Sequence, residues 1–221
     1  MAESVPQTLS LDALSLNSLG THLLYGAIDE QSAYETSHWL LKSALIYNPD
    51  EILTMFINSP GGNVDDGNAI ISLMESNPHQ IQTVAIGCIA SMGVSIFIAG
   101  TRGMRLMTKN CLVMTHQFTT GMFGKQHELI AGNRMVQILE NQFIEHYTRN
   151  TNMTAKQVKD ILLGPSDRWL EPKECLKYGL CDKIVDTYVD KSGQGTTDNV
   201  KPAAKKVAKK KTTKVSATDE Q

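Results

Sequence analysis

Short apolar runs alternate along this chain with longer stretches of helical periodicity. The near-continuous apolar runs at 51–57 (EILTMFI) and 81–86 (IQTVAI) are typical of strands that are buried on both faces of a sheet. Shorter runs of similar character predict further strands at 21–28, 111–115 and 183–187.

Helices are predicted where apolar residues recur at spacings of three and four. The longest spans about 125–150, and its apolar stripe consists of Leu129, Met135, Ile138, Leu139, Phe143 and Ile144. Another covers 31–47, with Tyr34, Trp39, Leu41, Leu45 and Ile46 among its apolar positions. Further helices are predicted from the loop at 58–62 to about residue 75, after a Thr154 cap, and at 171–178. Strands that alternate with helices indicate an α/β layered domain built from repeated crossover units.

Charge is distributed unevenly along the 221 residues, whose formal net charge is −2. Residues 201–221 contain seven lysines against Asp219 and Glu220, a local net charge of +5, and residues 1–200 carry −7. This tail has almost nothing to bury, so we expect a disordered Lys-rich segment over 191–221. It could tether a polyanion such as nucleic acid through nonspecific contacts, or it could be a solubilising extension, and we favour the second interpretation.

Several classes of protein do not fit this composition. No apolar run reaches the roughly 18–20 residues of a membrane span, so no membrane association is expected. The N-terminus, MAESVPQTLS, lacks Lys and Arg and is not followed by an apolar run, so no signal or transit peptide is expected. The four cysteines match neither a disulfide framework nor a common zinc pattern. We therefore expect free thiols in a reducing cytoplasm, with no metal and no cofactor.

Three polar residues stand at positions where chemistry could occur, although each also has an ordinary structural explanation. Ser91 lies in Ala-Ser-Met-Gly between a buried strand and an apolar segment, where it could simply cap a helix. His116 ends the strand at 111–115, as many structural histidines do. Asp167 follows a Pro-containing loop, where it could cap a helix or pair with an arginine. Their separation in sequence cannot show that they converge, because a catalytic triad is defined by geometry.

Five sequence blocks resolve this ambiguity through a resemblance. They are FINSPGG (56–62), AIGCIASMG (85–93), VMTHQ (113–117), SDRWLEPKE (166–174) and KYGLCDKIV (177–185). In this order, and at nearly this spacing, they resemble the Clp protease proteolytic subunit (ClpP) family of serine peptidases, as a divergent bacterial or phage-encoded member. The resemblance runs from about residue 19 to about residue 187.

The resemblance implies an ATP-dependent serine endopeptidase that hydrolyses peptide bonds in proteins and peptides inside a ring-shaped chamber. It implies Ser91 as nucleophile, His116 as general base and Asp167 as the residue that orients the base. The backbone amides of Gly62 and Met92 would form the oxyanion hole. The loop 162–166 (LLGPS) is a couple of residues longer than the family's, so Asp160 is the competing assignment for the third member.

The resemblance also implies a fold, domain boundaries and partners. The fold is of the ClpP/crotonase type, with repeated β-β-α crossover units and a protruding helical handle at about 125–150. Residues 1–18 would form an N-terminal segment and 19–190 the peptidase domain. Heptameric rings would stack as a tetradecamer in the cytoplasm of a bacterium or of a phage's host. Pro165 and Ser166 stand where the family has charged residues that couple the two rings, so a single ring is the alternative. ATP hydrolysis would belong to an AAA+ unfoldase of the ClpX, ClpA or ClpC type, because the chain has no phosphate-binding loop.

Other functions remain compatible with parts of the pattern. A catalytically silent ring or scaffold subunit would typically lack one member of the triad, and all three are present. A crotonase-fold acyl-CoA enzyme shares the fold and a similar oxyanion hole but does not need the Ser, His and Asp set. A signal-peptide peptidase of the same fold would use a lysine base, which His116 makes superfluous.

Overall fold

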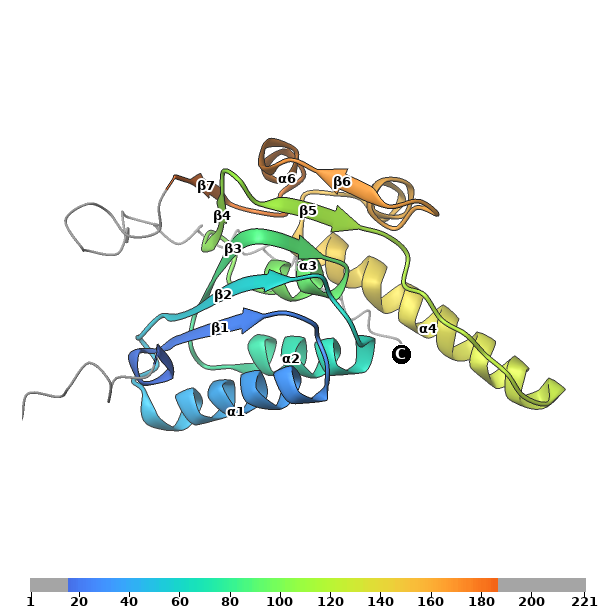
Figure 1. Cartoon of the computed structure of the whole chain (residues 1–221), viewed down its shortest axis with the longest axis horizontal. Helices are drawn as coiled ribbons and strands as arrows, with labels where there is room; N and C mark the ends of the chain where they lie inside the picture. The colour runs from blue at the N-terminus through green and yellow to red at the C-terminus, as the bar shows by residue number, and fades with distance from the viewer. Residues whose placement is uncertain (1–15, 187–221) are drawn as a thin grey trace, which may run out of the picture.

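The computed structural model describes residues 16–186, and these form a mainly parallel sheet with helices packed on it (Figure 1). The strand order is β1-β2-β3-β4-β7, and every neighbouring pair along this path is parallel. The bounds are Thr21–Tyr25 for β1, Leu53–Ser59 for β2, Ile81–Ala90 for β3, Arg105–Thr108 for β4 and Lys183–Val185 for β7. The expectations for most of the N-terminal segment and for the Lys-rich tail fall outside the described residues.

The sheet branches at β3, and this branching positions the site. The first half of β3 pairs with β4, whereas Cys88–Ala90 pairs with β5 (Leu112–Thr115). Gly87 lies between the two halves with φ 61°, a conformation that favours glycine. The Asn58 side chain accepts a hydrogen bond from the Cys88 amide there, at 3.0 Å. The bend separates β5 from β4, and β5 then pairs antiparallel with β6 (Arg168–Leu170).

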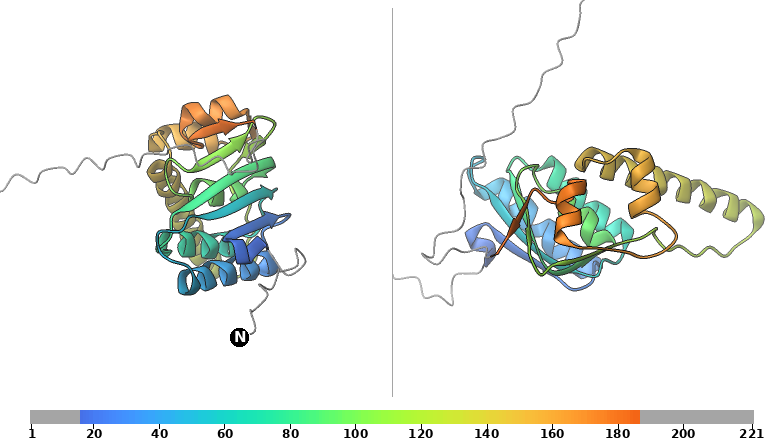
Figure 2. Two further views of the ribbon diagram at one scale, coloured as in Figure 1. Left: turned by 90° about the vertical axis from the view of Figure 1, so that its left-hand side faces the viewer. Right: turned by 90° about the horizontal axis from the view of Figure 1, so that it is seen from above.

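Helices cover the sheet and enclose the main apolar core. In Figures 1 and 2, α1 (Glu30–Ile46), α2 (Val64–Ser76) and α3 (Met92–Ile98) lie together along the sheet. Near the C-terminal end are α5 (Ala155–Gln157), the π-helix η3 (Val158–Leu162) and α6 (Pro172–Tyr178), and the short 3-10 helix η2 (Leu16–Leu19) precedes β1. The expected α/β fold of crossover units is confirmed. The sequence pattern did not predict β4, β6 or η2, and the helix that it predicted after Thr154 consists of α5 continued by the π-helix.

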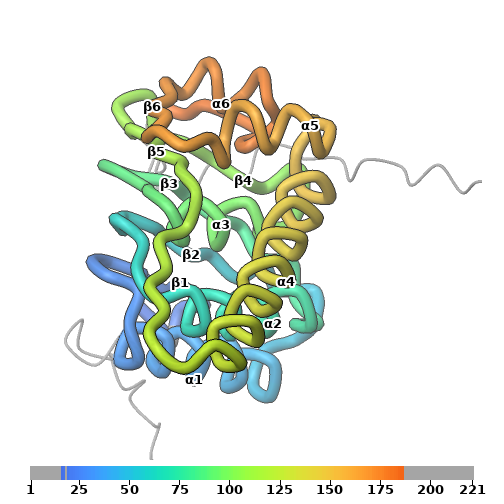
Figure 3. The backbone as a smooth tube through the Cα atoms, turned by 90° about the vertical axis from the view of Figure 1, so that its right-hand side faces the viewer, coloured from blue at the N-terminus to red at the C-terminus, as the bar shows by residue number. Residues whose placement is uncertain are grey.

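Helix α4 (Gln126–Asn150) is the protruding handle that the resemblance implied. Only its last two turns contribute buried residues, namely Ile144, His146 and Tyr147. The strap 117–124 leaves β5 and runs out to the tip of α4, which then returns to the body of the molecule (Figures 1 and 3). Met122 of the strap packs against Gly132, where a Cβ atom would lie 2.3 Å from the Met122 Sδ atom.

The apolar residues of α1 divide between two faces. Its buried face consists of Ala33, Thr36, Trp39, Leu40 and Ser43. Four of the five apolar positions emphasised by the sequence pattern point to solvent in the single chain: Tyr34, Leu41, Leu45 and Ile46. The helix therefore packs on the body through Trp39, Leu40 and three smaller residues, and an apolar face stays uncovered.

A buried ion pair ties the last turn of α4 to the sheet. Arg105 of β4, which is 1% exposed, donates two hydrogen bonds to Asp182, at 2.8 Å from Nε and 2.6 Å from Nη2. Its Nη1 group donates to the backbone carbonyl of Asn150. Burial alone would raise the pKa of Asp182, but the hydrogen bonds and charge of Arg105 outweigh burial and hold that pKa below its ordinary value.

Within residues 16–186 no helix is both long and apolar enough to cross a bilayer.

Candidate active site

Ser91 lies at a sharp turn between the end of β3 and the start of α3. Its φ of 51° and ψ of −122° make it the one residue other than glycine with a positive φ among residues 16–186. Such a conformation costs about 1–3 kcal/mol and persists only where the surroundings enforce it. Ser91 occupies the N-cap position of α3, but its side chain makes no capping hydrogen bond. The helix-capping explanation for this serine is therefore wrong.

A backbone hydrogen bond to strand β5 holds this turn in place. The Ser91 amide donates to the Met114 carbonyl of β5 at 2.9 Å, two residues before His116. Thus the strand that carries His116 is attached directly to the turn that carries Ser91.

The Ser-Pro-Gly-Gly loop packs against the same turn. A Cβ atom on Gly61 would lie 2.7 Å from the Ser91 Cβ atom and 2.9 Å from the Met92 amide nitrogen. At Gly62 a Cβ atom would lie 2.1 Å from the Ile28 carbonyl oxygen, and both glycines have a positive φ. No other residue would fit in either position without a shift of backbone.

Two amide groups in this region are available as hydrogen-bond donors. Neither the Gly62 nor the Met92 N–H group has a recorded acceptor in the part of the chain that the structure describes. For Met92 the reason is general, because the first amides of a helix have no partner within the helix. Met92 follows Ser91 directly, and Gly62 follows Gly61, which packs against the Ser91 turn. Unengaged amides near a serine hydroxyl can stabilise a negatively charged oxygen.

His116 and Asp167 meet because of the register between β5 and β6. Thr115 pairs with Arg168 in this antiparallel ladder, so the residues just outside it are brought to the same end. The His116 Nδ1 atom lies 3.5 Å from the Asp167 Oδ1 atom, and the two side chains are 28% and 58% exposed. Asp160 instead contacts Lys156, four residues earlier. Arg168 pairs with Glu174, so Asp167 is not used in an arginine pair with its neighbour.

Ser91 and His116 line one small hollow of about 20 Å³, which is roughly the space of a single water molecule. The other lining residues are Val64, Met92, Ser95, Phe118, Phe143, Tyr147 and Leu163, and no lysine is among them. The structure records no hydrogen bond between Ser91 and His116. In enzymes without bound substrate, such contacts are often long and tighten when the substrate binds.

A larger pocket adjoins this hollow. It has a volume of about 250 Å³ and shares Phe118, Phe143 and Leu163 with the hollow. Its remaining walls come from the strap, from α4 and from the π-helix, and include Val136, Glu140 and Lys159. Lys159 and Glu140 form an ion pair of 3.2 Å at this pocket. The pocket could receive an apolar side chain next to the reactive hydroxyl.

No cysteine thiol competes with Ser91 at this place. All four cysteines are free, and burial raises the pKa of the thiols, to about 12 for Cys111 and Cys181. None of them lines the hollow.

Across residues 16–186 no group of three or more His, Cys, Asp or Glu side chains is arranged to hold a metal ion.

Comparison with known proteins decides the family. The family model of the Clp protease matches residues 15–188 of the chain. The chain belongs to the Clp protease family. The match covers the whole sheet, the handle helix and every residue of the candidate site.

Several Clp protease proteolytic subunits are similar to the chain over about two thirds of its length or more. ATP-dependent Clp protease proteolytic subunit 3 of Streptomyces avermitilis is 31% identical over 182 residues, which are 81% of this chain and 81% of that protein. ATP-dependent Clp protease proteolytic subunit 1 of Leifsonia xyli subsp. xyli is 35% identical over 143 residues, 65% of this chain and 72% of that protein. Subunit 2 of Thermobifida fusca is 34% identical over 142 residues, 64% of this chain and 68% of that protein.

Sequence reasoning named Ser91, Met92 and His116 among the residues that line this hollow, but it missed most of the others. Ser95 and Tyr147 line the hollow, and neither belongs to a block that carried the resemblance. Phe118 lies two residues after His116 and could have been noticed on that ground alone. The other wall residues carry no local signal, because only packing of α3, α4 and the π-helix brings them together.

Proposed function

We propose that the chain is a serine endopeptidase in which Ser91 is the nucleophile, His116 the general base and Asp167 the residue that orients the base. The observation that carries this proposal is the shared hollow: Ser91 and His116 line it, and Asp167 lies against the Nδ1 atom of His116. The free Nε2 atom of His116 is then the one that would accept the hydroxyl proton.

The proposed reaction uses these groups in two steps. The Ser91 Oγ atom attacks the peptide carbonyl carbon while His116 takes the hydroxyl proton, and the Gly62 and Met92 amides donate to the resulting oxyanion. His116 then gives that proton to the leaving amine, and an acyl-enzyme remains. Water attacks the ester by the same route and releases Ser91 and a carboxylic acid. Each oxyanion donor would contribute about 3–4 kcal/mol to transition-state stabilisation.

Partners and assembly are part of the proposal. We expect stacked heptameric rings in the cytoplasm, with an AAA+ unfoldase of the ClpX, ClpA or ClpC type supplying the ATP-dependent step. The similar proteins from Streptomyces avermitilis and Thermobifida fusca are named as proteolytic subunits of an ATP-dependent protease, which supports this expectation. The exposed apolar faces of α1 and α4 also support it, because a solitary chain would leave them in water.

Labelling with a serine-directed fluorophosphonate tests the proposed nucleophile. The full chain is incubated with the probe, digested, and the modified peptide is sequenced by mass spectrometry. We expect one adduct on Ser91, which disappears in the His116→Ala variant. An assembled protein without any adduct would favour a catalytically silent scaffold, and an adduct at another serine would overturn the assignment.

A further inference from the structure

Helix α3, which begins directly after Ser91, is attached to the handle helix by a buried hydrogen bond. The His146 Nε2 atom lies 2.8 Å from the Ser95 carbonyl oxygen, and the two residues are 8% and 1% exposed. This carbonyl lacks its usual helical partner, because the Ala99 amide donates to Ile96 instead. His146 therefore satisfies a backbone acceptor that the short helix α3 leaves open.

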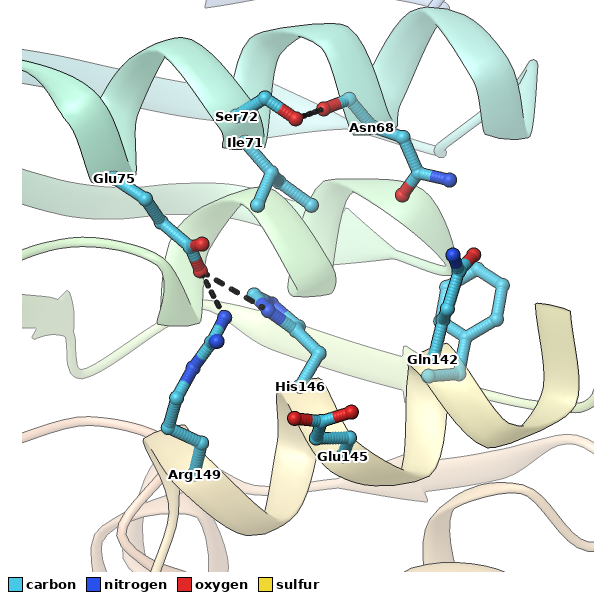
Figure 4. A pocket seen from close by; sticks show the side chains of 9 residues that line it. Asn68, Ile71, Ser72, Glu75, Gln142, Glu145, His146 and Arg149 are labelled. Carbon is cyan, nitrogen blue, oxygen red and sulfur yellow. Dashed lines mark hydrogen bonds and ion pairs between the residues drawn. The ribbon is translucent and has the colours of Figure 1, made fainter. Parts of the chain in front are cut away.

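The groups on the other side of the imidazole determine how the ring is held. A carbonyl oxygen can only accept, so the His146 Nε2 atom carries a proton. The Nδ1 atom lies 3.2 Å from Asn150 Nδ2, which can donate to it, and 3.6 Å from the Glu75 carboxylate. Glu75 in turn pairs with Arg149 (Figure 4). Burial lowers the pKa of His146, which agrees with a neutral ring in this one tautomer.

The contact is close enough to Ser91 to affect its position. Ser95 lies one helical turn after Ser91, and its amide is 3.4 Å from the Ser91 carbonyl oxygen. Ser95 and Met92 both line the hollow, and the Ser95 hydroxyl is 3.4 Å from the Tyr147 hydroxyl. Since α3 has seven residues, a shift at Ser95 would displace the Ser91 turn and the Met92 amide together.

We propose that His146 is a positioning residue for Ser91, acting through the Ser95 carbonyl. This inference rests on the proposed function. His146 does not line the hollow, and it is reached instead from a separate polar cavity of about 260 Å³ between α2 and α4 (Figure 4). A misplacement of about 1 Å in a catalytic group can lower a rate about a hundredfold, so the effect should be seen in kcat.

A pair of substitutions at His146 separates positioning from simple packing. His146→Leu keeps the volume and removes the donor, whereas the amide of His146→Gln can still donate to Ser95. For hydrolysis of a short fluorogenic peptide by the full chain, we expect kcat to fall about ten- to a hundredfold in His146→Leu. We expect KM to change less than twofold, because the apolar pocket is untouched. His146→Gln should recover at least a third of the wild-type kcat.

Two outcomes would overturn the inference while leaving the proposed function intact. One is a kcat in His146→Leu within twofold of wild type, and the other is an equal loss in both variants. If His146→Leu does not fold, Asn150→Ala replaces it, since this change loosens the ring without emptying the core. A several-fold fall in kcat at constant KM is then expected, and a wild-type kcat would overturn the inference. Wild-type protein that neither hydrolyses peptide nor labels at Ser91 would refute the proposed function, and this inference with it.

Discussion

The His116 Nδ1 atom lies 3.5 Å from the Asp167 Oδ1 atom. The two residues are far apart in the sequence, since His116 follows β5 and Asp167 precedes β6. The contact follows from the pairing of Thr115 with Arg168 between β5 and β6. A carboxylate in this position holds the imidazole in the tautomer whose Nε2 atom faces away from it. The arrangement therefore distinguishes Asp167 from Asp160, the other candidate.

Replacement of Asp167 by asparagine should lower kcat by a factor of about 10² to 10⁴ through the wrong histidine tautomer. Because the Asp167 side chain is 58% exposed, we expect a value near the lower end of this range. Steady-state hydrolysis of a short fluorogenic peptide measures it. Asp160→Asn is the matched control and should leave kcat within twofold, since Asp160 only pairs with exposed Lys156. A larger loss in Asp160→Asn than in Asp167→Asn would reverse the assignment.

Replacement of Ser91 by glycine should abolish hydrolysis and yet stabilise the fold. The positive φ of Ser91 costs about 1–3 kcal/mol, and glycine removes most of this strain. Glycine also loses more conformational entropy on folding, about 0.5–1 kcal/mol, so we expect a net gain of about 1 kcal/mol in the free energy of unfolding. Urea denaturation measures the gain, and Ser91→Ala should be equally inactive without it. Exposed Ser76→Ala is the control for unchanged activity.

Retained peptide hydrolysis in Ser91→Ala would show that another group is the nucleophile. Lower stability in Ser91→Gly than in wild type would show that the turn is not strained in solution.

Acid should destabilise the fold through His22. Burial lowers the pKa of His22 from 6.5 to about 4, with a smaller opposing effect of Glu35. Above pH 6.5 the ring is neutral in both states, so it adds no pH dependence. Between pH 6.5 and 4 the unfolded chain binds a proton that the folded chain does not, and stability falls by up to about 3 kcal/mol as pH decreases.

Urea denaturation at a series of pH values, for wild type and His22→Gln, measures this contribution. The glutamine can still donate to Thr36, which lies 2.9 Å from the His22 Nε2 atom. The difference between the two stability curves should narrow as pH falls from 6.5 to 4, because only wild type loses the histidine contribution. Parallel curves would mean that His22 titrates alike in the folded and unfolded states.

Breaking the buried Arg105–Asp182 pair should be costly. Arg105→Met leaves the Asp182 carboxylate, which is 21% exposed, without its charged partner, and we expect a loss of about 3 kcal/mol in the free energy of unfolding, the low end of the range for buried pairs. The double variant Arg105→Met with Asp182→Leu should recover part of this loss, because no uncompensated charge remains. Lys109→Met is the control, since its pair with Asp186 is 60% and 80% exposed and should matter by less than about 1 kcal/mol. Equal effects at both sites would contradict the burial argument.

The assembled mass should be fourteen times the chain mass of 24.3 kDa, measured by size-exclusion chromatography with light scattering. Ile138→Glu, on the exposed apolar stripe of α4, should shift the mass to seven chains if this helix joins two rings. The substitution adds a charge at a 43% exposed position, so it should not unfold the chain. A monomer at micromolar concentration would refute the ring proposal, and an unaffected mass in Ile138→Glu would refute the role of the stripe.

Much of the architecture could be predicted from the sequence because its signals are local. Apolar runs and helical periodicity predicted β2, the first half of β3 and α4, since burial on both faces or on one stripe imposes these patterns on neighbouring residues. The Gly61-Gly62 dipeptide and the Ala-Ser-Met-Gly block likewise marked two tight backbone positions. Both now prove to need a positive φ, which is a property of single residues.

The tertiary structure alone decided what depends on contacts between distant segments. Asp160 and Asp167 carry the same side chain, so the sequence alone could not show which of them contacts His116. Only the register of β5 with β6 brings Asp167 to that histidine. The outward face of α1 could not be read from its apolar residues, because Ala33, Thr36 and Ser43 fit the closely packed side better than larger groups do. The contact between His146 and Ser95 has no signal in either local sequence. It exists because the Ser95 carbonyl near the end of α3 is left to accept from a side chain of α4, where α4 returns to the body. A local sequence pattern cannot encode a contact between two separate helices.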